Sequence, residues 1–138
     1  MVELYYIEIN TKGKNEMKDI TAELRDILAG SSLQNGQALV FVPGATGALS
    51  TIEYEPGLVK DFPALMEKMI PEKEYYCHNE TWHDGNGHSH LRATLVGPSL
   101  TIPFTGGSLI LGTWQQVVFL EFDNKPHHRR LVVQLIGE

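Results

Sequence analysis

The second half of the chain contains a series of short apolar segments, and this feature limits the possible folds most. Five such segments follow His90, separated by Gly-Pro, Gly-Gly and Asp-Asn-Lys-Pro turns. Short apolar runs between turn residues are typical of antiparallel strands. The expected strands cover residues 91–96, 99–104, 109–111, 116–122 and 130–136.

The first half adds helices to this pattern. Ile20, Leu24, Ile27 and Leu28 recur at helical spacing, which predicts a helix over residues 20–29. A second helix is expected near residues 58–69, and three earlier strands near residues 3–10, 37–42 and 49–54. Helices placed early and strands placed late predict an α+β fold. We expect one domain, residues 1–138, that is β-sandwich-like, with mainly antiparallel sheets and two or three flanking helices.

Composition excludes several classes of protein. The formal net charge is -6, which disfavours general nucleic-acid binding because phosphate contacts need clustered Lys and Arg. The basic cluster at residues 127–130 is interpreted as a turn and the start of a strand. No apolar run reaches the ~18 residues of a membrane span. Residues 1–4 lack the features of a signal peptide, so a cytoplasmic protein without a membrane segment is expected.

The stretch from His78 to His90 carries the densest chemistry. His88 and His90 are two residues apart, which on a strand places both imidazoles on one face. Two imidazoles on one face favour a divalent metal site, and zinc is the first expectation. Glycines in the intervening loop would let it fold back and bring His78 or His83 to the pair. The alternative interpretation is a set of surface histidines in a polar loop.

Other polar residues could complete such a site. Asp84, Asn86 and Glu121 could orient a histidine ring, and Asp84 or Glu121 could act as a general base. Arg92, two residues after His90, would share its face on a strand and could bind phosphate, or it could simply be solvated. The expected catalytic residues are Asp84, Arg92 and Glu121, and the expected substrate-binding residues are Asn86, Ser99, Trp114 and Gln115.

Several segments together resemble the YjbQ-like family, also called the secondary thiamine-phosphate synthase family. The matching segments are residues 19–21, 42–43, 90–99, 111–115, 121–123 and 134–138. The resemblance implies a trimer built around a β-sandwich with flanking helices. It also implies a histidine-lined site, thought to hold a metal, near a subunit boundary. This chain has Gly44 where many members have a histidine, and we expect His83 or His88 to replace that ligand.

The resemblance also implies a reaction. Family members are associated with joining a hydroxymethylpyrimidine diphosphate to a thiazole phosphate, with release of pyrophosphate. We therefore expect a metal-dependent enzyme that acts on a phosphorylated heterocycle, whose partners are that small molecule and further copies of the chain. The alternatives are another metal-assisted hydrolase and a non-catalytic trimer that binds a metal or a small molecule.

Overall fold

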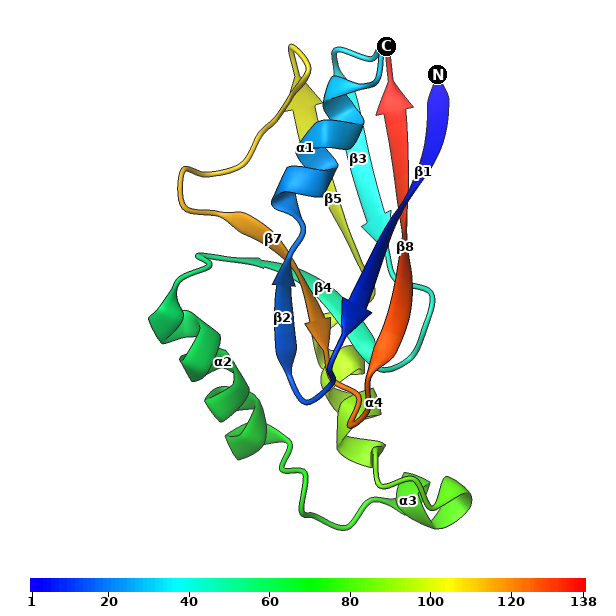
Figure 1. The fold of residues 1–138 in the computed structure, drawn as a ribbon, viewed down its shortest axis with the longest axis vertical. Coiled ribbons are helices and arrows are strands. Elements are labelled where there is room, and N and C mark those ends of the chain that lie inside the picture. The colour runs from blue at the N-terminus through cyan, green and yellow to red at the C-terminus, as the bar shows by residue number, and fades with distance from the viewer.

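The structure is a computed structural model that describes residues 1–138. It contains eight strands and four helices (Figure 1). In chain order these are β1 (Val2–Thr11), β2 (Glu16–Asp19), α1 (Thr21–Ala29), β3 (Gly36–Phe41), β4 (Gly47–Ile52), α2 (Pro56–Met69), α3 (Cys77–Trp82), α4 (Gly87–Val96), β5 (Ser99–Thr105), β6 (Ser108–Leu109), β7 (Gln116–Glu121) and β8 (His127–Gly137).

The strands form two antiparallel sheets. The larger sheet has the strand order β1-β8-β3-β5-β6, and the smaller one has the order β2-β7-β4. Each strand pair in both sheets is antiparallel. The predicted α+β class with mainly antiparallel sheets is therefore confirmed, with four helices in place of two or three.

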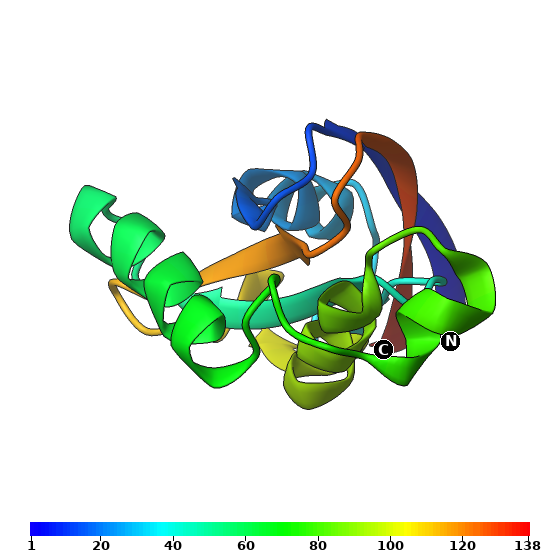
Figure 2. The ribbon, with the colours of Figure 1, turned by 90° about the horizontal axis from the view of Figure 1, so that it is seen from below.

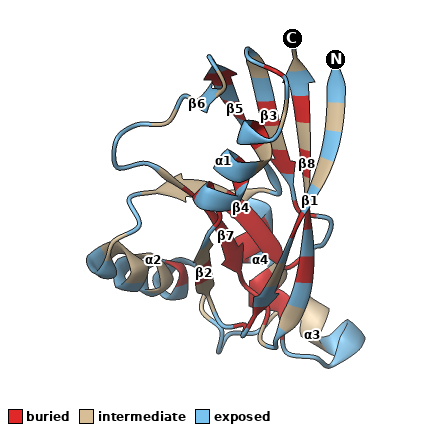
Figure 3. Cartoon of the chain, turned by 45° about the horizontal axis from the view of Figure 1, so that its top comes forward, coloured by how far each residue is buried: buried red, intermediate tan, exposed pale blue.

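Strand β7 lies between two hydrophobic cores. Val117 and Phe119 point into a core shared with the larger sheet and α1, whereas Val118 and Leu120 point into a second core with α2 and α4. A strand alternates its side chains between two faces, so burial on both faces explains the continuous apolar run. Figure 3 shows this strand buried over most of its length.

The prediction of a strand at residues 91–96 is wrong, because these residues belong to helix α4. The strand was predicted because this short apolar segment ends at the Gly97-Pro98 turn. In the helix Ala93 is buried, while Leu91 and Leu95 are exposed together at a spacing of four. Leucine, arginine and alanine are all good helix formers, so local propensity agrees with the helix.

No helix of the fold combines the length and the apolar character that crossing a bilayer requires.

Candidate functional site

The core between the two sheets ends in a buried ion pair. Glu121 continues the inward row of Val117 and Phe119 on β7, and Arg129 continues the inward row of Leu131 on β8. Arg129 Nε donates to Glu121 Oε1 at 2.8 Å, and Nη2 donates to Oε2 at 2.5 Å. The side chain of Glu121 is 0% exposed and that of Arg129 is 9% exposed. Burying either charge without an opposite charge beside it would be costly, so the two side chains stay paired. The two parallel hydrogen bonds hold them in one geometry.

Further polar side chains surround this pair. Thr11 Oγ1 donates to Glu121 Oε1 at 2.6 Å, and Arg129 Nη2 donates to Thr46 Oγ1 at 2.9 Å. Asp123, two residues beyond Glu121, accepts from Thr46 at 3.3 Å. These residues come from four different segments of the chain. The sandwich therefore ends in a buried polar network rather than in solvent.

Asp123 connects this network to a histidine. Its Oδ2 lies 2.6 Å from His127 Nε2, and its Oδ1 accepts from Asn86 Nδ2 at 3.3 Å. Burial alone would raise the pKa of Asp123, but the hydrogen bonds that it accepts, first the one from His127, lower this pKa below its ordinary value. Asp123 is therefore a buried carboxylate that stays ionised.

Asn86 relays this arrangement to His78. Because the Asn86 amide nitrogen donates to Asp123, its oxygen is left as the acceptor, and that oxygen lies 3.0 Å from His78 Nε2. A neutral His78 ring then carries its proton on Nε2 to complete the bond, which leaves a lone pair on Nδ1. The network thus sets the tautomer and the ring orientation of one histidine.

His78 and His90 form a pair beside a pocket. Their ring centroids are 4.3 Å apart. His78 belongs to α3 and His90 to α4, and these two helices are in contact at the end of the molecule that faces the viewer in Figure 2. His90 lines a pocket of about 300 Å³ together with Ala93 and Thr94 of α4. The opposite wall comes from Gly44, Ala45, Gly47 and Pro98. The loop between His78 and His90 does fold back, as the sequence predicted.

Gly87 lets α3 and α4 lie close together because it has no side chain. A Cβ atom there would lie 2.6 Å from Cβ of Tyr76, which is closer than packed atoms allow. Its backbone N–H donates to Asn79 Oδ1 at 2.9 Å. Gly87 therefore allows the start of α4 to pack directly on α3, which carries His78.

The four histidines predicted as metal ligands do not gather in one chain. His88 is buried on another face of α4, because residues two apart on a helix point in nearly opposite directions. His83 is exposed at the end of α3. No three His, Cys, Asp or Glu side chains of the chain form a metal-binding group. The structure therefore shows no group in one chain in which His83 or His88 replaces the ligand absent at residue 44.

His88 instead occupies a buried site of its own. Its Nδ1 is the one fully buried side-chain nitrogen or oxygen without a hydrogen-bond partner, and Ser89 Oγ lies 3.4 Å from its Nε2. Burial, and then the positive charge of Arg92, lowers the pKa of His88 below its ordinary value. The ring is thus held neutral inside the helix packing.

Arg92 does not reach the pocket either. It is 2% exposed, and its guanidinium donates to Glu67, to Asn15 and to the backbone oxygen of Ile70. The strand on which it would have shared a face with His90 is a helix, so Arg92 points elsewhere. It joins α4 to the end of α2, and the predicted phosphate contact is not supported by this placement.

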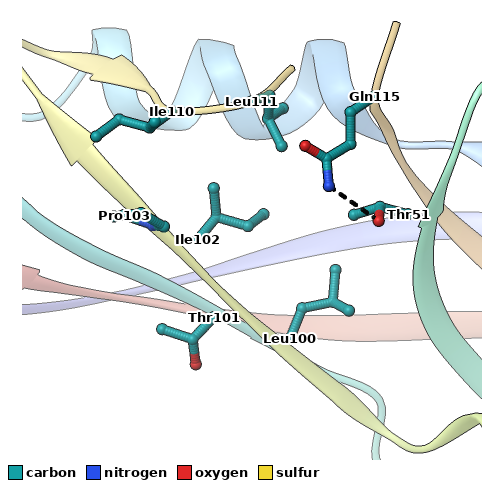
Figure 4. A pocket seen from close by; sticks show the side chains of 8 residues that line it. All are labelled: Thr51, Leu100, Thr101, Ile102, Pro103, Ile110, Leu111 and Gln115. Carbon is teal, nitrogen blue, oxygen red and sulfur yellow. Dashed lines mark hydrogen bonds between the residues drawn. The ribbon is translucent and has the colours of Figure 1, made fainter.

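Trp114 and Gln115 lie far from the histidine pair. They precede Gln116, the first residue of β7, whereas Glu121 at the site is the last. Trp114 is 72% exposed. Gln115 lines a separate pocket, half of whose lining residues are hydrophobic, and its amide donates to Thr51 Oγ1 at 3.1 Å (Figure 4). Neither residue lines the pocket that contains His90.

The other predicted residues have mixed placements. Asp84 Oδ1 lies 3.6 Å from His78 Nε2, so this carboxylate is next to the pair. Ser99 is exposed at the start of β5, beside Pro98 of the pocket wall. Glu121 is unsuited to act as a general base, because both of its oxygens accept hydrogen bonds in a fully buried pair with Arg129.

Asp123, Arg129, Thr46 and His127 belong to the site but were not among the predicted residues. A signal for two of them was present in the sequence. Asp123 is in phase with the inward residues of β7, and Arg129 is in phase with the inward Leu131, Val133 and Leu135 of β8. A charged residue at a core-facing strand position requires a partner, and the partner here closes the network.

Comparison with known proteins agrees with this fold. The family model for UPF0047 protein YjbQ-like matches residues 5–138. This chain belongs to that family. A UPF0047 protein of Archaeoglobus fulgidus is 38% identical over 130 residues, which cover 94% of this chain and 98% of the relative.

Solved structures of similar proteins have the same architecture. A protein from Aeropyrum pernix superposes with a TM-score of 0.92 at 32% identity, over 99% of each chain. A YbjQ-like protein of unknown function from Sulfolobus solfataricus superposes with a TM-score of 0.90 at 31% identity, over 100% of each chain. The likeness therefore extends over the complete domain, including the segments that form the polar network.

Proposed function

We propose that this protein is a metal-dependent enzyme that acts on a phosphorylated heterocycle in the pocket beside His90. The observation that carries the proposal is the pairing of His78 and His90 at 4.3 Å on top of a buried relay through Asn86. Fixed imidazole orientation beside a concave pocket is typical of catalytic and metal-binding sites. A pocket of about 300 Å³ has the size of a small-molecule site.

One chain supplies only some of the ligands that a metal ion would need. His78 Nδ1 is free for a ligand bond, and His90 supplies a second imidazole, but no third such side chain of the same chain completes the group. The remaining ligands would be water, substrate or a group from another subunit. A divalent cation held there would supply positive charge that stabilises developing charge on a leaving phosphate.

The residues of the chain have defined tasks in this proposal. His78 is held by Asn86 with its proton on Nε2, so Nδ1 would act as the base or the ligand. Asp123 keeps Asn86 in one orientation and stays ionised. Asp84, 3.6 Å from His78 Nε2, would stabilise a protonated imidazole. The reaction we propose joins a pyrimidine diphosphate to a thiazole phosphate and releases pyrophosphate.

The proposal includes a homotrimer and a cytoplasmic location. Leu91 and Leu95 are 47% and 56% exposed on α4, beside the helix face that carries His90 and Thr94. A second subunit that covers this apolar ridge would lie close enough to the pocket to contribute to it. Light scattering after size exclusion should give three times the 15.4 kDa chain mass, and Leu95→Lys should lower that mass.

The enzymatic proposal is tested by measuring pyrophosphate release. Purified protein is given hydroxymethylpyrimidine diphosphate and thiazole phosphate with a divalent cation, alongside the His90→Ala variant. His83→Ala serves as the control, because His83 is exposed at the end of α3 and does not line the pocket beside His90. The proposal expects release by the wild type and the control, and loss on the order of a hundredfold or more in His90→Ala. Equal release by all three proteins would overturn it.

A further inference from the structure

Arg129 presents one unused edge of its guanidinium. Two of its three nitrogens are engaged by Glu121 and Thr46. The third, Nη1, forms no hydrogen bond within the chain. It is not fully buried either, because His88 Nδ1 is the only fully buried side-chain nitrogen or oxygen without a partner. The Arg129 side chain is nevertheless nine-tenths buried, so its orientation is set by the ion pair.

The surface next to this edge is open because residue 44 is glycine. A Cβ atom at Gly44 would lie 3.1 Å from Arg129 Nη1, so any side chain there would crowd the guanidinium. Gly44 has φ of +152° and is exposed. The missing side chain therefore leaves the Nη1 donors accessible beside the loop that also lines the His90 pocket.

A hollow with further positive groups adjoins Arg129. It has a volume of about 410 Å³ and is lined by Tyr6, Pro43, His128, Arg129, Arg130 and Val132. The Arg130 guanidinium stacks 3.7 Å from the centroid of the Tyr6 ring, which fixes its direction. The opposing charge at the rim is Glu8, 3.6 Å from His128 Nε2 and 61% exposed. Arg130 lies on the outer face of β8 and Arg129 on its inner face, and both residues line this hollow in an otherwise acidic chain.

We propose that Arg129 and Arg130, with His128, form a phosphate-binding site in the hollow beside Pro43, next to the loop that also lines the pocket of His90. Guanidinium donors held in a fixed direction bind phosphate oxygens more strongly than a mobile cation does. Under the proposed function, on which this role rests, the site holds the substrate phosphate while the opposite end of the substrate lies at His78 and His90. This assigns to Arg129 the anion contact that Arg92 cannot make.

Calorimetric titration of the purified full-length protein with inorganic phosphate and pyrophosphate tests the site. We expect saturable binding by the wild type, with acetate binding much more weakly. Arg129→Lys should weaken phosphate binding on the order of tenfold, because the fixed planar donor is lost. Arg25→Lys is the matched control, because Arg25 is exposed on α1 and does not line the hollow.

Two further variants keep the test decisive if Arg129→Lys folds poorly. Arg130→Gln changes an exposed side chain, and Gly44→Ala places a Cβ atom 3.1 Å from Arg129 Nη1 and so crowds that edge. Both should weaken phosphate binding. Wild-type affinity in both, or no saturable phosphate binding by the wild type, would overturn the proposal.

The same titration on His90→Ala separates this inference from the proposed function. Phosphate binding that persists in His90→Ala but is lost in Arg130→Gln supports the arginine site, whatever the enzyme assay shows. Phosphate binding lost in His90→Ala but unchanged in Arg130→Gln would place the anion at the histidine pair. That result would overturn the arginine site and leave the proposed function standing.

Discussion

Replacement of Glu121 by glutamine should lower the free energy of unfolding by about 3–5 kcal/mol, the range for breaking a buried ion pair. The carboxylate is 0% exposed and accepts four hydrogen bonds, two from Arg129, one from Thr11 and one from the backbone of Asp123. Glutamine keeps the shape of the side chain but removes its charge. Its NH2 group would also face the groups that donate hydrogen bonds to Glu121. Arg129 is then left buried with no counter-charge.

A double-mutant cycle measures this coupling directly. Glu121→Leu and Arg129→Met should each destabilise the fold by a similar amount, whereas the double variant should lose far less, since paired apolar replacement of a buried ion pair is often close to neutral. Urea unfolding at one fixed protein concentration provides the free energies. Glu8→Gln is the control, because Glu8 pairs with His128 at an exposed position and should change stability by less than about 0.5 kcal/mol. A coupling energy below about 1 kcal/mol would refute the reasoning.

Three other predictions follow from the contacts around the site. Arg92→Met should lower the urea midpoint by the equivalent of about 1–3 kcal/mol while leaving phosphate affinity unchanged, and a loss of phosphate binding at full stability would contradict its structural role. Gly87→Ala should destabilise by about 1–3 kcal/mol, because its Cβ would meet Tyr76 at 2.6 Å, and a neutral effect would contradict the close packing. Because the folded-state pKa of Asp123 is lowered, the stability that it contributes is present above about pH 4 and is lost as the pH falls below that value. Urea midpoints measured between about pH 5 and 2 should decline less in Asp123→Asn, and parallel curves would contradict the assignment.

Much of the fold could be predicted from the sequence, because most elements show one clear period. The strands at β3, β5, β7 and β8 were expected within a few residues of their observed bounds. Helix α4 was not, because Leu91 and Leu95 are apolar yet exposed, so its apolar pattern does not mark the buried face. Prediction of a helix or strand from the spacing of apolar residues assumes that these residues are buried, so exposed leucines lead to a wrong assignment.

The candidate site was predictable only in part. The sequence predicted that the loop between His78 and His90 folds back, because its glycines allow a close approach, and the two rings do lie 4.3 Å apart. The ligand set was not, since it depended on a strand where a helix forms. Arg129 and Asp123 were missed although Glu121 and His127 lie within eight residues of them, because only the packing of the two sheets brings β7, β8 and the loop before β4 together.

Metal analysis of the purified protein tests the central claim most directly. Elemental analysis should detect a divalent metal in the wild type, in a fixed ratio to the chain, and that metal should be absent from His78→Ala and from His90→Ala. His83→Ala and His128→Ala should retain it, because neither side chain belongs to the pair at the pocket. Metal content that is unchanged in both His78→Ala and His90→Ala would contradict the account.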